Sequence, residues 1–307
     1  MAAVAPHPVT AEAVTKRLTG GKADVSGVVF KLLLIASLVF SLLVLLILVW
    51  SQVAGGWEVL STRLGDFLTS KNSRLAGRSG ILQGLVGTLT IGLFVAALAF
   101  PIGVGAAIYL EEYAPHSRLT RFIDVNIRNL AGVPSIVYGI LGFAIFVKAL
   151  GDLTGGRSLM AAGTTLAILA LPIVIITSSE AIRAVPDSIR EAGYGVGATK
   201  WEVIRSHVLP YAAPGILTGT MLALARALGE AAPLILVGAV TGFFTGGEFG
   251  DLRGSFTAMP VQLFYWAKQP SDAWRVNTAA GIVVLLVVVL AINAAAIALR
   301  NVYEKKR

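Results

Sequence analysis

Two apolar runs, each long enough to cross a membrane, constrain this chain more than any other feature of its sequence. Residues 32–50 and 281–299 consist almost entirely of Leu, Val, Ile and Ala. A helix of roughly 20 mostly apolar residues crosses the hydrocarbon core of a bilayer. In the whole chain 56% of the residues are hydrophobic and only 14% are charged, whereas soluble domains carry about 25% charged residues. The sequence therefore predicts an integral membrane protein and argues against a soluble enzyme.

Four further segments are apolar enough to cross the membrane but contain proline and many glycines. The six predicted transmembrane helices cover residues 28–50, 85–110, 130–150, 159–180, 215–240 and 279–300. The middle four carry one proline each, at Pro101, Pro134, Pro172 and Pro233. Neighbouring helices must satisfy the backbone groups that these residues disturb. We therefore predict an all-α bundle of six packed helices.

A polar segment, residues 1–27, precedes the first predicted span. Its basic residues resemble the start of a signal peptide. The apolar stretch that follows is too long for the hydrophobic region of such a peptide and lacks a clean small-residue cleavage site. We interpret residues 28–50 as a retained transmembrane anchor and residues 1–27 as a cytoplasmic segment.

Lysine and arginine are distributed unequally between the two sides of the predicted bundle. With a cytoplasmic amino terminus, 15 of the 25 basic residues lie in inner segments and nine in outer ones, and Arg226 belongs to neither. Cytoplasmic segments of membrane proteins carry the excess of basic residues. Both termini are therefore predicted to be cytoplasmic. Much of the formal net charge of +8 follows from this topology, so no nucleic acid partner is expected.

The chain lacks the residue types of the common catalytic sites. It contains no cysteine and three histidines, which excludes disulfides, thiolate catalysis and cysteine-ligated metals. No nucleophile stands at a recognisable spacing from a base. We expect neither a metal nor a cofactor, and an intramembrane enzyme is the least favoured class.

A polar segment, residues 181–212, separates the fourth and fifth predicted spans. Pro186 suits a helix start, and a row of apolar and small residues follows at helical spacing: Ile189, Ala192, Gly193 and Val196. Gly195 and Gly197 then interrupt this helix. The small residues leave a groove into which side chains of another protein could insert. An amphipathic hairpin resting on lipid headgroups is the alternative, and composition leaves both open.

The second half of this segment predicts another short helix. Thr199 and Glu202 have the spacing of a capping box. One face of the helix carries Trp201, Ile204 and Val208, and Pro210 is expected to end it. Two short helices joined at a bend are therefore predicted on the cytoplasmic side.

The fifth predicted span contains a charge where the membrane makes charge costly. Arg226 lies near the centre of residues 215–240, and Glu230 follows four residues later on the same side of the helix. An arginine at the centre of a membrane helix costs about 2.5–3.5 kcal/mol. The two side chains could simply neutralise each other within the bundle. Alternatively, the planar guanidinium group, which matches phosphate geometry, lines an anion pathway with Glu230 positioning it.

The segment 181–212 resembles the EAA motif of ABC importer permeases. The matching positions are Glu191, Ala192, Gly193, Gly197, Leu209 and Pro210. Gly193 stands where the motif has a second alanine, and His207 stands where an aliphatic residue is usual. The resemblance implies that these residues form coupling helices which dock into a separate ATP-binding subunit. The sequence itself contains no G-x-x-x-x-G-K-[ST] loop to hold ATP phosphates.

Three further segments, residues 132–139, 225–234 and 259–263, resemble the phosphate-import permeases of the PstA type. The match covers roughly residues 80–300. It implies a MetI-like type I importer fold in the plasma membrane of a bacterium, with Arg226 and Glu230 as translocation residues. It also implies a second, related permease subunit, two copies of an ATPase and an extracytoplasmic phosphate-binding protein.

Other functions and features stay open from the sequence. A permease for sulfate, molybdate or phosphonate is an alternative, as is a stand-alone secondary transporter of anions. Glu111 and Glu112 are expected to be solvated or paired near Arg118 and Arg121, and Glu180 to form a structural pair with Arg183. The outer segments 51–83 and 241–278 receive no definite role.

Overall fold

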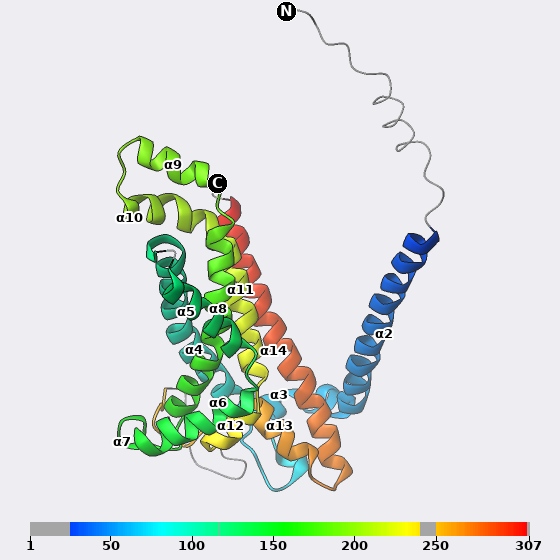
Figure 1. Ribbon diagram of the computed structural model, residues 1–307. Coiled ribbons are helices and arrows are strands. Elements are labelled where there is room, and N and C mark those ends of the chain that lie inside the picture. Colours follow the sequence, from blue (N-terminus) through cyan, green and yellow to red (C-terminus); the bar gives the residue numbers. More distant parts are fainter. Residues whose placement is uncertain (1–24, 116, 240–249, 306–307) are drawn as a thin grey trace, which may run out of the picture. The chain divides into compact units, whose positions relative to one another are not determined.

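The computed structural model describes residues 25–115, 117–239 and 250–305, and every regular element in these ranges is helical (Figure 1). The elements are α2 (Val25–Thr62), α3 (Leu64–Thr69), η1 (Ala76–Arg78), α4 (Leu82–Ile108), η2 (Tyr109–Tyr113), α5 (Arg118–Ala131), α6 (Ser135–Gly142), η3 (Phe143–Ala149), α7 (Gly151–Thr154), α8 (Leu159–Arg183), α9 (Asp187–Gly195), α10 (Lys200–Val203), η4 (Ile204–Val208), α11 (Leu209–Gly229), α12 (Ala232–Val237), α13 (Met259–Ala267) and α14 (Asp272–Lys305). η1 is a 3₁₀ turn, whereas η2, η3 and η4 are π-helical. The predicted all-α class is confirmed. Residues 1–24 and 240–249 lie outside the described ranges. Most of the predicted cytoplasmic segment 1–27 and parts of the predicted segments 215–240 and 241–278 fall on them.

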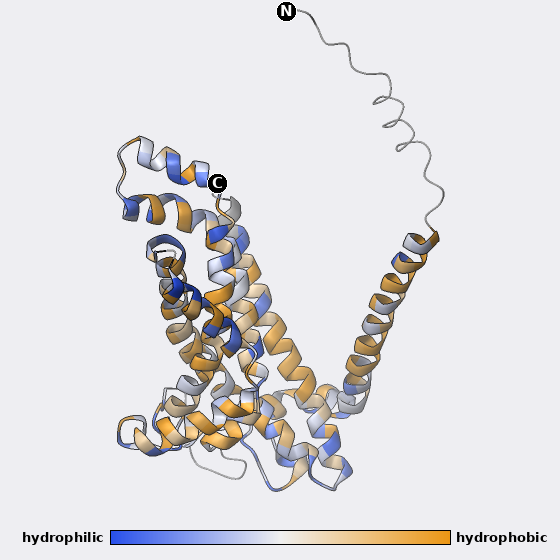
Figure 2. Cartoon of the chain, viewed as in Figure 1, coloured by the Kyte–Doolittle hydropathy of each residue, from blue (hydrophilic) through white to orange (hydrophobic). Residues whose placement is uncertain are grey.

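Within the described residues, five helices are long and apolar enough to cross a membrane. They are Val25–Thr62, Leu82–Tyr113, Leu159–Arg183, Lys200–Gly229 and Asp272–Ala298. A sixth span is present if the bent pair Arg118–Ala131 and Ser135–Ala149 is counted as one. In Figure 2, which colours the ribbon by residue hydropathy, hydrophobic residues predominate along these helices. The expected number of six therefore depends on a broken span.

The chain divides into two compact units, and the first ends at Ser51. Its helical part is the amino-terminal portion of α2, which contains the predicted first span. The apolar side chains of this portion are exposed along nearly its whole length. Because such a surface is stable only in an apolar surrounding, this unit has the character of a lipid-facing anchor.

The second unit, Gln52–Arg307, is built around α4, α8 and α11, which pack against one another, with α14 on α11. Its largest apolar cluster includes Ile91, Leu166 and Ala223, one from each of these three helices. Glycine allows the close approach: a Cβ atom at Gly103 would lie 2.6 Å from Cγ1 of Val174. Small residues serve this purpose in membrane bundles because lipid offers no hydrophobic drive for helix association. Figure 1 places α9 and α10 at one end of this bundle and α6, α7, α12 and α13 at the other.

The predicted third span, residues 130–150, is wrong as a single straight element. α5 ends at Ala131, and α6 begins at Ser135 after a bend of 100°. Pro134 is the N-cap of α6, which confirms the expected helix start. A residue before proline avoids helical geometry, so Val133 cannot continue α5. The proline therefore stands at the start of the helix that fills most of the predicted span, Ser135–Ala149, and α5 precedes it as a separate helix.

An arginine holds the segment 63–83, for which the sequence predicted no definite role. The guanidinium group of Arg63 donates to the carbonyl oxygens of Gly77 and Ser79 at 2.9 and 3.3 Å. It also donates to the carbonyl of Ala76 and to the side-chain oxygen of Asn277 in α14. One side chain thus joins the loop around η1 to the start of the last span.

We predict that Arg63→Ala releases this loop. Each lost hydrogen bond to a charged group costs about 1.5–3 kcal/mol, so the apparent Tm of the purified protein in detergent should fall by several degrees. Limited proteolysis should then cut within residues 70–80. Arg78→Ala is the matched control, because Arg78 is an exposed residue of the same loop. Equal resistance of Arg63→Ala and Arg78→Ala to protease would contradict the prediction.

Candidate functional site

Helix α11 ends earlier than expected, so the predicted continuous span over residues 215–240 is wrong. The helix stops at Gly229, Glu230 is its C-cap with an extended ψ of 119°, and α12 begins at Ala232. In a continuous helix the ring of Pro233 would clash with the carbonyl of Gly229 and would supply no N–H. Pro233 instead lies in the first turn of α12, where its missing N–H costs nothing.

Arg226 and Glu230 remain neighbours although they do not share a helix. Arg226 lies in the last turn of α11 rather than at mid-span, and its Nε is 3.9 Å from Oε1 of Glu230. At this distance the contact is an ion pair without a hydrogen bond. The side chain of Arg226 is 50% exposed and that of Glu230 is 21% exposed.

The exposed guanidinium group lies on the outward face of α11. Leu222, one turn earlier, is exposed on the same face, while Ala223 and Ala227 are buried against the bundle. Within the described residues the Arg226 side chain makes no hydrogen bond. Its donors are therefore available to a ligand or to another chain that covers this face.

The motif segments that suggested a phosphate importer meet at the end of the bundle opposite α9 and α10. α6 packs on α12, and a Cβ atom at Gly139 would lie 2.7 Å from Cα of Pro233. α13 carries the third motif, and the N–H of Met259 donates to Oγ1 of Thr88 in α4 at 2.8 Å. These motif residues build the scaffold around the broken end of α11.

The hairpin predicted on the cytoplasmic side is formed by α9, α10 and the turn between them, and we call this element the hairpin (Figure 1). Pro186 is the N-cap of α9, and Gly197 in the turn has a φ of +84°, a conformation that favours glycine. The capping box is confirmed. The Thr199 hydroxyl accepts from the N–H of Glu202, and the Glu202 carboxylate accepts from the N–H of Thr199.

A groove opens on the α9 side of the hairpin, as the small residues predicted. It encloses about 430 Å³ and is lined by Ser188, Ile189, Ala192, Gly193, Val196 and His207. Of the EAA positions, Ala192 and Gly193 line the groove, and Glu191 is exposed on the same helix. Gly197 shapes the turn. Leu209, half-buried, and Pro210, exposed, begin α11 outside the groove.

The second helix of the hairpin differs from its prediction in where it ends and in which residues of its first turn are buried. Pro210 does not end it, because α10 continues through the π-helical η4 into α11 as one helix from Lys200 to Gly229. π turns accommodate a disturbed hydrogen-bond ladder inside a helix. Trp201 is exposed, whereas Val203 is buried in its place. His207, which stands at the usual aliphatic position of the motif, is exposed and lies in the groove wall.

Gly193 is the one EAA position that is buried. A Cβ atom there would lie 2.7 Å from Cγ2 of Val203, across the hairpin. The glycine that departs from the usual alanine therefore fits the close approach of α9 to α10.

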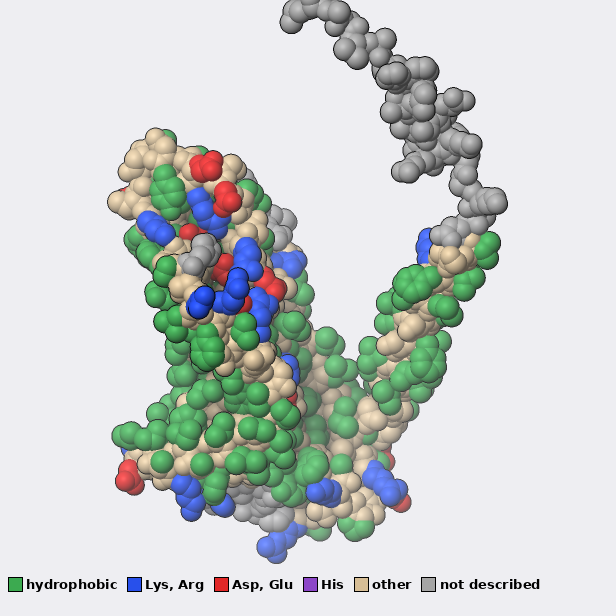
Figure 3. Space-filling model, in the orientation of Figure 1, with side chains coloured by type: hydrophobic (Ala, Val, Ile, Leu, Met, Phe, Trp, Pro, Cys, Tyr) green, Lys and Arg blue, Asp and Glu red, His purple; other side chains and the backbone are tan. Residues whose placement is uncertain are grey.

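Acidic and basic side chains gather where α4 and α8 end beside the hairpin. Arg183 donates to Oε1 of Glu111 at 2.7 Å, and Arg190 donates to Oε1 of Glu112 at 2.9 Å. The expected pair of Glu180 with Arg183 is wrong, because Arg183 binds the end of α4. Figure 3 shows the Lys and Arg side chains on this face. These two pairs could not be predicted from sequence spacing, because their members are more than 70 residues apart.

Comparison with known proteins identifies the family. Residues 99–307 match the family described as binding-protein-dependent transport system inner membrane component. The chain belongs to this family.

Two curated relatives show how far this permease resembles named proteins. It is 33% identical to the phosphate transport system permease protein PstA 1 of Mycobacterium tuberculosis, over 88% of this chain and 87% of that protein. It is 36% identical to the phosphate transport system permease protein PstC of Mesorhizobium japonicum, over 59% of this chain and 62% of that protein.

Among solved structures, the permease is similar to a chain of the MetNI methionine ABC transporter. The TM-score is 0.59 at 20% identity, over 73% of this chain and 95% of that chain. At this identity the similarity establishes the fold, which is the predicted MetI-like fold of ABC importer permeases.

The close approach at Gly193 generates a prediction for the hairpin. Gly193→Ala should separate α9 from α10, because overpacking a tight contact costs about 1–3 kcal/mol. Hydrogen exchange of the amides in residues 187–208 should become several-fold faster. Gly195→Ala is the control, since a Cβ atom at Gly195 meets nothing within 4 Å. Unchanged hydrogen exchange in Gly193→Ala would contradict the prediction, because it would show that the Val203 side chain moves aside without destabilising the hairpin.

Proposed function

We propose that this permease is the PstA-type subunit of an ATP-driven phosphate importer in a bacterial plasma membrane. It passes inorganic phosphate across the membrane and hydrolyses no ATP itself. The names of the relatives in M. tuberculosis and M. japonicum support phosphate as the substrate. The absence of an ATP-binding loop from the sequence supports a separate ATPase.

The observation that carries this proposal is the half-exposed guanidinium group on the outward face of α11. Lipid cannot cover it cheaply, because an arginine in hydrocarbon costs about 2.5–3.5 kcal/mol. A water-filled pathway beside a second permease subunit offers both water and an anion. Arg226 then holds phosphate through its planar N–H donors. The loose contact with Glu230 keeps the guanidinium oriented while leaving its donors available.

The second subunit is proposed to be a related permease of the PstC type. This chain resembles both PstA and PstC proteins, as expected of two subunits that share a fold and line one pathway between them. An extracytoplasmic phosphate-binding protein delivers the anion at the end of the bundle that contains α6, α12 and α13.

The hairpin is proposed to dock on the ATPase, with one ATPase copy for each permease subunit. The carboxyl-terminal end of α14 is then cytoplasmic, because α11 leads away from the hairpin and α14 returns along it (Figure 1). The proposal of a cytoplasmic amino terminus rests on the distribution of basic residues in the sequence. The excess of basic residues predicted for the hairpin side agrees with this orientation. The groove lined by Ala192 and Gly193 receives an apolar side chain of the ATPase.

For the pathway, we predict that Arg226→Ala and Arg226→Lys both lower phosphate uptake by about 100-fold. A charged hydrogen bond is worth up to about 3 kcal/mol, and lysine cannot reproduce the planar fork. Uptake of radiolabelled phosphate into cells or proteoliposomes measures the effect, with subunit assembly checked by co-purification. Glu230→Gln separates orientation from charge, since glutamine keeps a polar partner for the guanidinium.

Arg275→Ala serves as the control for that series, because Arg275 is an exposed arginine whose side chain is 72% accessible. Normal phosphate uptake in either Arg226 variant would remove Arg226 from the pathway. Competition by sulfate, molybdate or phosphonate in the same assay would reassign the anion.

For the hairpin, we predict that Ala192→Phe abolishes capture of the ATPase subunit. The added ring fills the groove and excludes the docking side chain. Co-purification of the ATPase with tagged permease measures capture, and ATP-independent phosphate flux in its absence would favour a secondary transporter. Gly195→Phe adds the same bulk to α9 outside the groove and should capture the ATPase normally. Capture by both variants would refute docking at the groove.

A further inference from the structure

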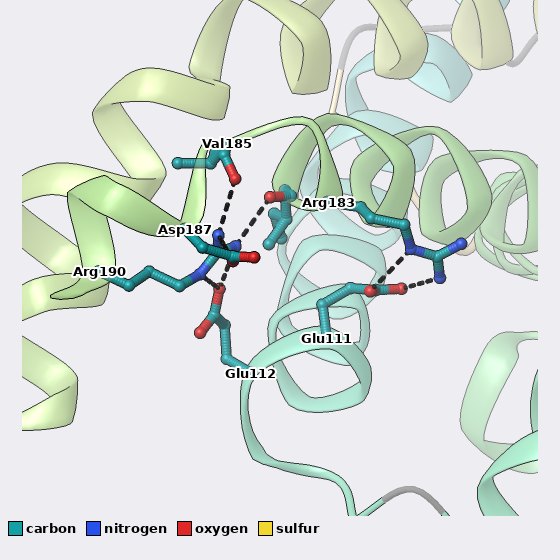
Figure 4. A network of polar contacts seen from close by, with 7 residues as sticks. Glu111, Glu112, Arg183, Val185, Asp187 and Arg190 are labelled. Atoms are coloured by element: carbon teal, nitrogen blue, oxygen red, sulfur yellow. Dashed lines mark hydrogen bonds and ion pairs between the residues drawn. The ribbon is translucent and has the colours of Figure 1, made fainter. Parts of the chain in front are cut away.

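Arg190 makes the most completely bonded polar contact at the hairpin (Figure 4). Its Nε and Nη2 donate to Oε1 of Glu112 at 3.1 and 2.9 Å. Its Nη1 donates to the carbonyl of Val185 at 2.8 Å and to Oδ1 of Asp187 at 3.1 Å. Nη2 also donates to the carbonyl of Ile182 at 3.0 Å. Five hydrogen bonds use five donors, the full number that a guanidinium group has.

These contacts join three elements that are separate in sequence. Arg190 belongs to α9, Ile182 to the last turn of α8, and Glu112 to η2 at the end of α4. The carbonyl of Ile182, in the last turn of α8, accepts from the N–H of Val185 at 3.2 Å and has the guanidinium group as a further donor. Arg190 is 17% exposed and Glu112 is 5% exposed, so water competes little for these bonds. The first helix of the hairpin is therefore fastened to two helices of the bundle.

The neighbouring pair of Arg183 with Glu111 does not do this. Its hydrogen bonds are as short, at 2.7 and 3.1 Å, but it connects α8 with η2 and does not reach the hairpin. The side chain of Arg183 is 59% exposed, and exposed ion pairs contribute little. The two pairs thus differ in location and burial rather than in chemistry.

Without Arg190, the first helix of the hairpin, α9, would be attached mainly by its two chain connections and by apolar packing. The contact of Lys200 Nζ with the Tyr113 ring, 4.9 Å from the ring centroid, joins η2 to α10 and not to α9. α9 follows α8 through residues 184–186, and α10 continues into α11. Because α10 is continuous with α11, the part that can rotate is α9, which is held at one end by residues 184–186 and at the other by the turn to α10. An apolar cluster beneath the hairpin, which includes Ala107, Ile182 and Val203, resists separation but has no directional preference. The bonded guanidinium group is a third point of attachment and removes this rotation.

The attachment leads towards the arginine of the proposed pathway. Glu112 ends the continuous helical segment that begins with α4, and α4 packs on α11 near Arg226. A Cβ atom at Gly92 of α4 would lie 2.8 Å from Cδ2 of Leu228, two residues beyond Arg226. Close-packed interiors transmit displacement because they have little free volume.

We propose that Arg190 is a positioning residue that makes the hairpin, α4 and α8 move as one body. This inference rests on the proposed docking of the ATPase at the hairpin. Movement of the ATPase then reaches the far end of α11 along two helices, α11 and α4. When Arg190 is lost, the hairpin still docks but rotates, and part of each ATPase stroke moves the hairpin alone.

The residue type is specific to this role. Lysine keeps the charge but has three donors on one atom, so it cannot bond Glu112, Val185 and Ile182 together. Glu112→Gln keeps the shape of the acceptor but removes its charge. Both variants should loosen the hairpin without altering the groove.

The coupling experiment uses the complete transporter in proteoliposomes with its phosphate-binding protein. Phosphate moved per ATP hydrolysed should fall by about tenfold in Arg190→Lys and Glu112→Gln, the size of effect expected for residues that carry coupling between sites. Capture of the ATPase and its rate of ATP hydrolysis should stay normal. Arg183→Ala, which removes the neighbouring exposed pair, should keep the normal ratio of phosphate to ATP.

A distance measurement tests the attachment of the hairpin through Arg190 without relying on transport. The chain has no cysteine, so Val196→Cys in the hairpin and Tyr109→Cys at the end of α4, both exposed positions, can be spin-labelled in the full chain in lipid nanodiscs. The distribution of distances between the labels should broaden in Arg190→Lys and stay narrow in Arg183→Ala.

Unchanged distances in Arg190→Lys would overturn the proposal, and so would a normal ratio of phosphate to ATP in that variant. Loss of ATPase capture with unchanged distances would also overturn it, because Arg190 would then be a docking residue. If the unaltered complex fails to capture an ATPase, the proposed function fails, and the spin-label distances still decide whether Arg190 fixes the hairpin.

Discussion

Every backbone N–H and C=O group inside a membrane must find a partner within the protein, and this constraint decides where the helices of the chain can break. At the break between α5 and α6, the carbonyl of Leu130 accepts from the N–H of Val133 at 3.1 Å and from the hydroxyl of Tyr138 at 2.9 Å, so it keeps donors where the helix ends. At the break after α11, the N–H of Glu230 returns to the carbonyl of Ala227 at 3.2 Å. Both breaks are compensated locally, so the bundle tolerates them.

The second of these breaks gives the charged pair its geometry. In an unbroken helix Arg226 and Glu230 would face each other across one turn and neutralise each other. The extended Glu230 instead leaves 3.9 Å between the charged atoms. The pair is close enough to share an electrostatic field and too far apart to use the guanidinium donors. Without the break, the two side chains would form a structural ion pair. With it, the guanidinium donors stay available to hold an anion.

Periodicity and length predicted the apolar helices, the capping box at Thr199 and the groove on α9, because those features depend on residues close together in sequence. The sequence also named Arg226 and Glu230, since charge within an apolar span is visible without a structure. Pro233 and Pro210 were interpreted wrongly. Proline ends one helix and is accommodated by a π turn in the other, and the choice depends on packing. The contact of Arg190 with Glu112 could not be predicted, because 78 residues separate the two.

The proposed function requires a mechanical link between the hairpin, as the site of ATPase docking, and Arg226, as a residue of the pathway. Arg226 lies 17 residues beyond Leu209, about 25 Å along α11 at 1.5 Å per residue. Charges exposed at the hairpin are screened by the surrounding salt solution, where the Debye length is about 8 Å, so an electrostatic effect of the proposed ATPase on Arg226 would be small. The amplitude of a displacement decreases less with distance when packed helices transmit it. α11 and α4 each contain a proline within their length, Pro214 and Pro101, and proline bends a helix, so neither helix alone transmits the whole displacement. A second helix, α4, fixed to the hairpin at one end and packed on Leu228 at the other, limits how much of the movement such bending absorbs.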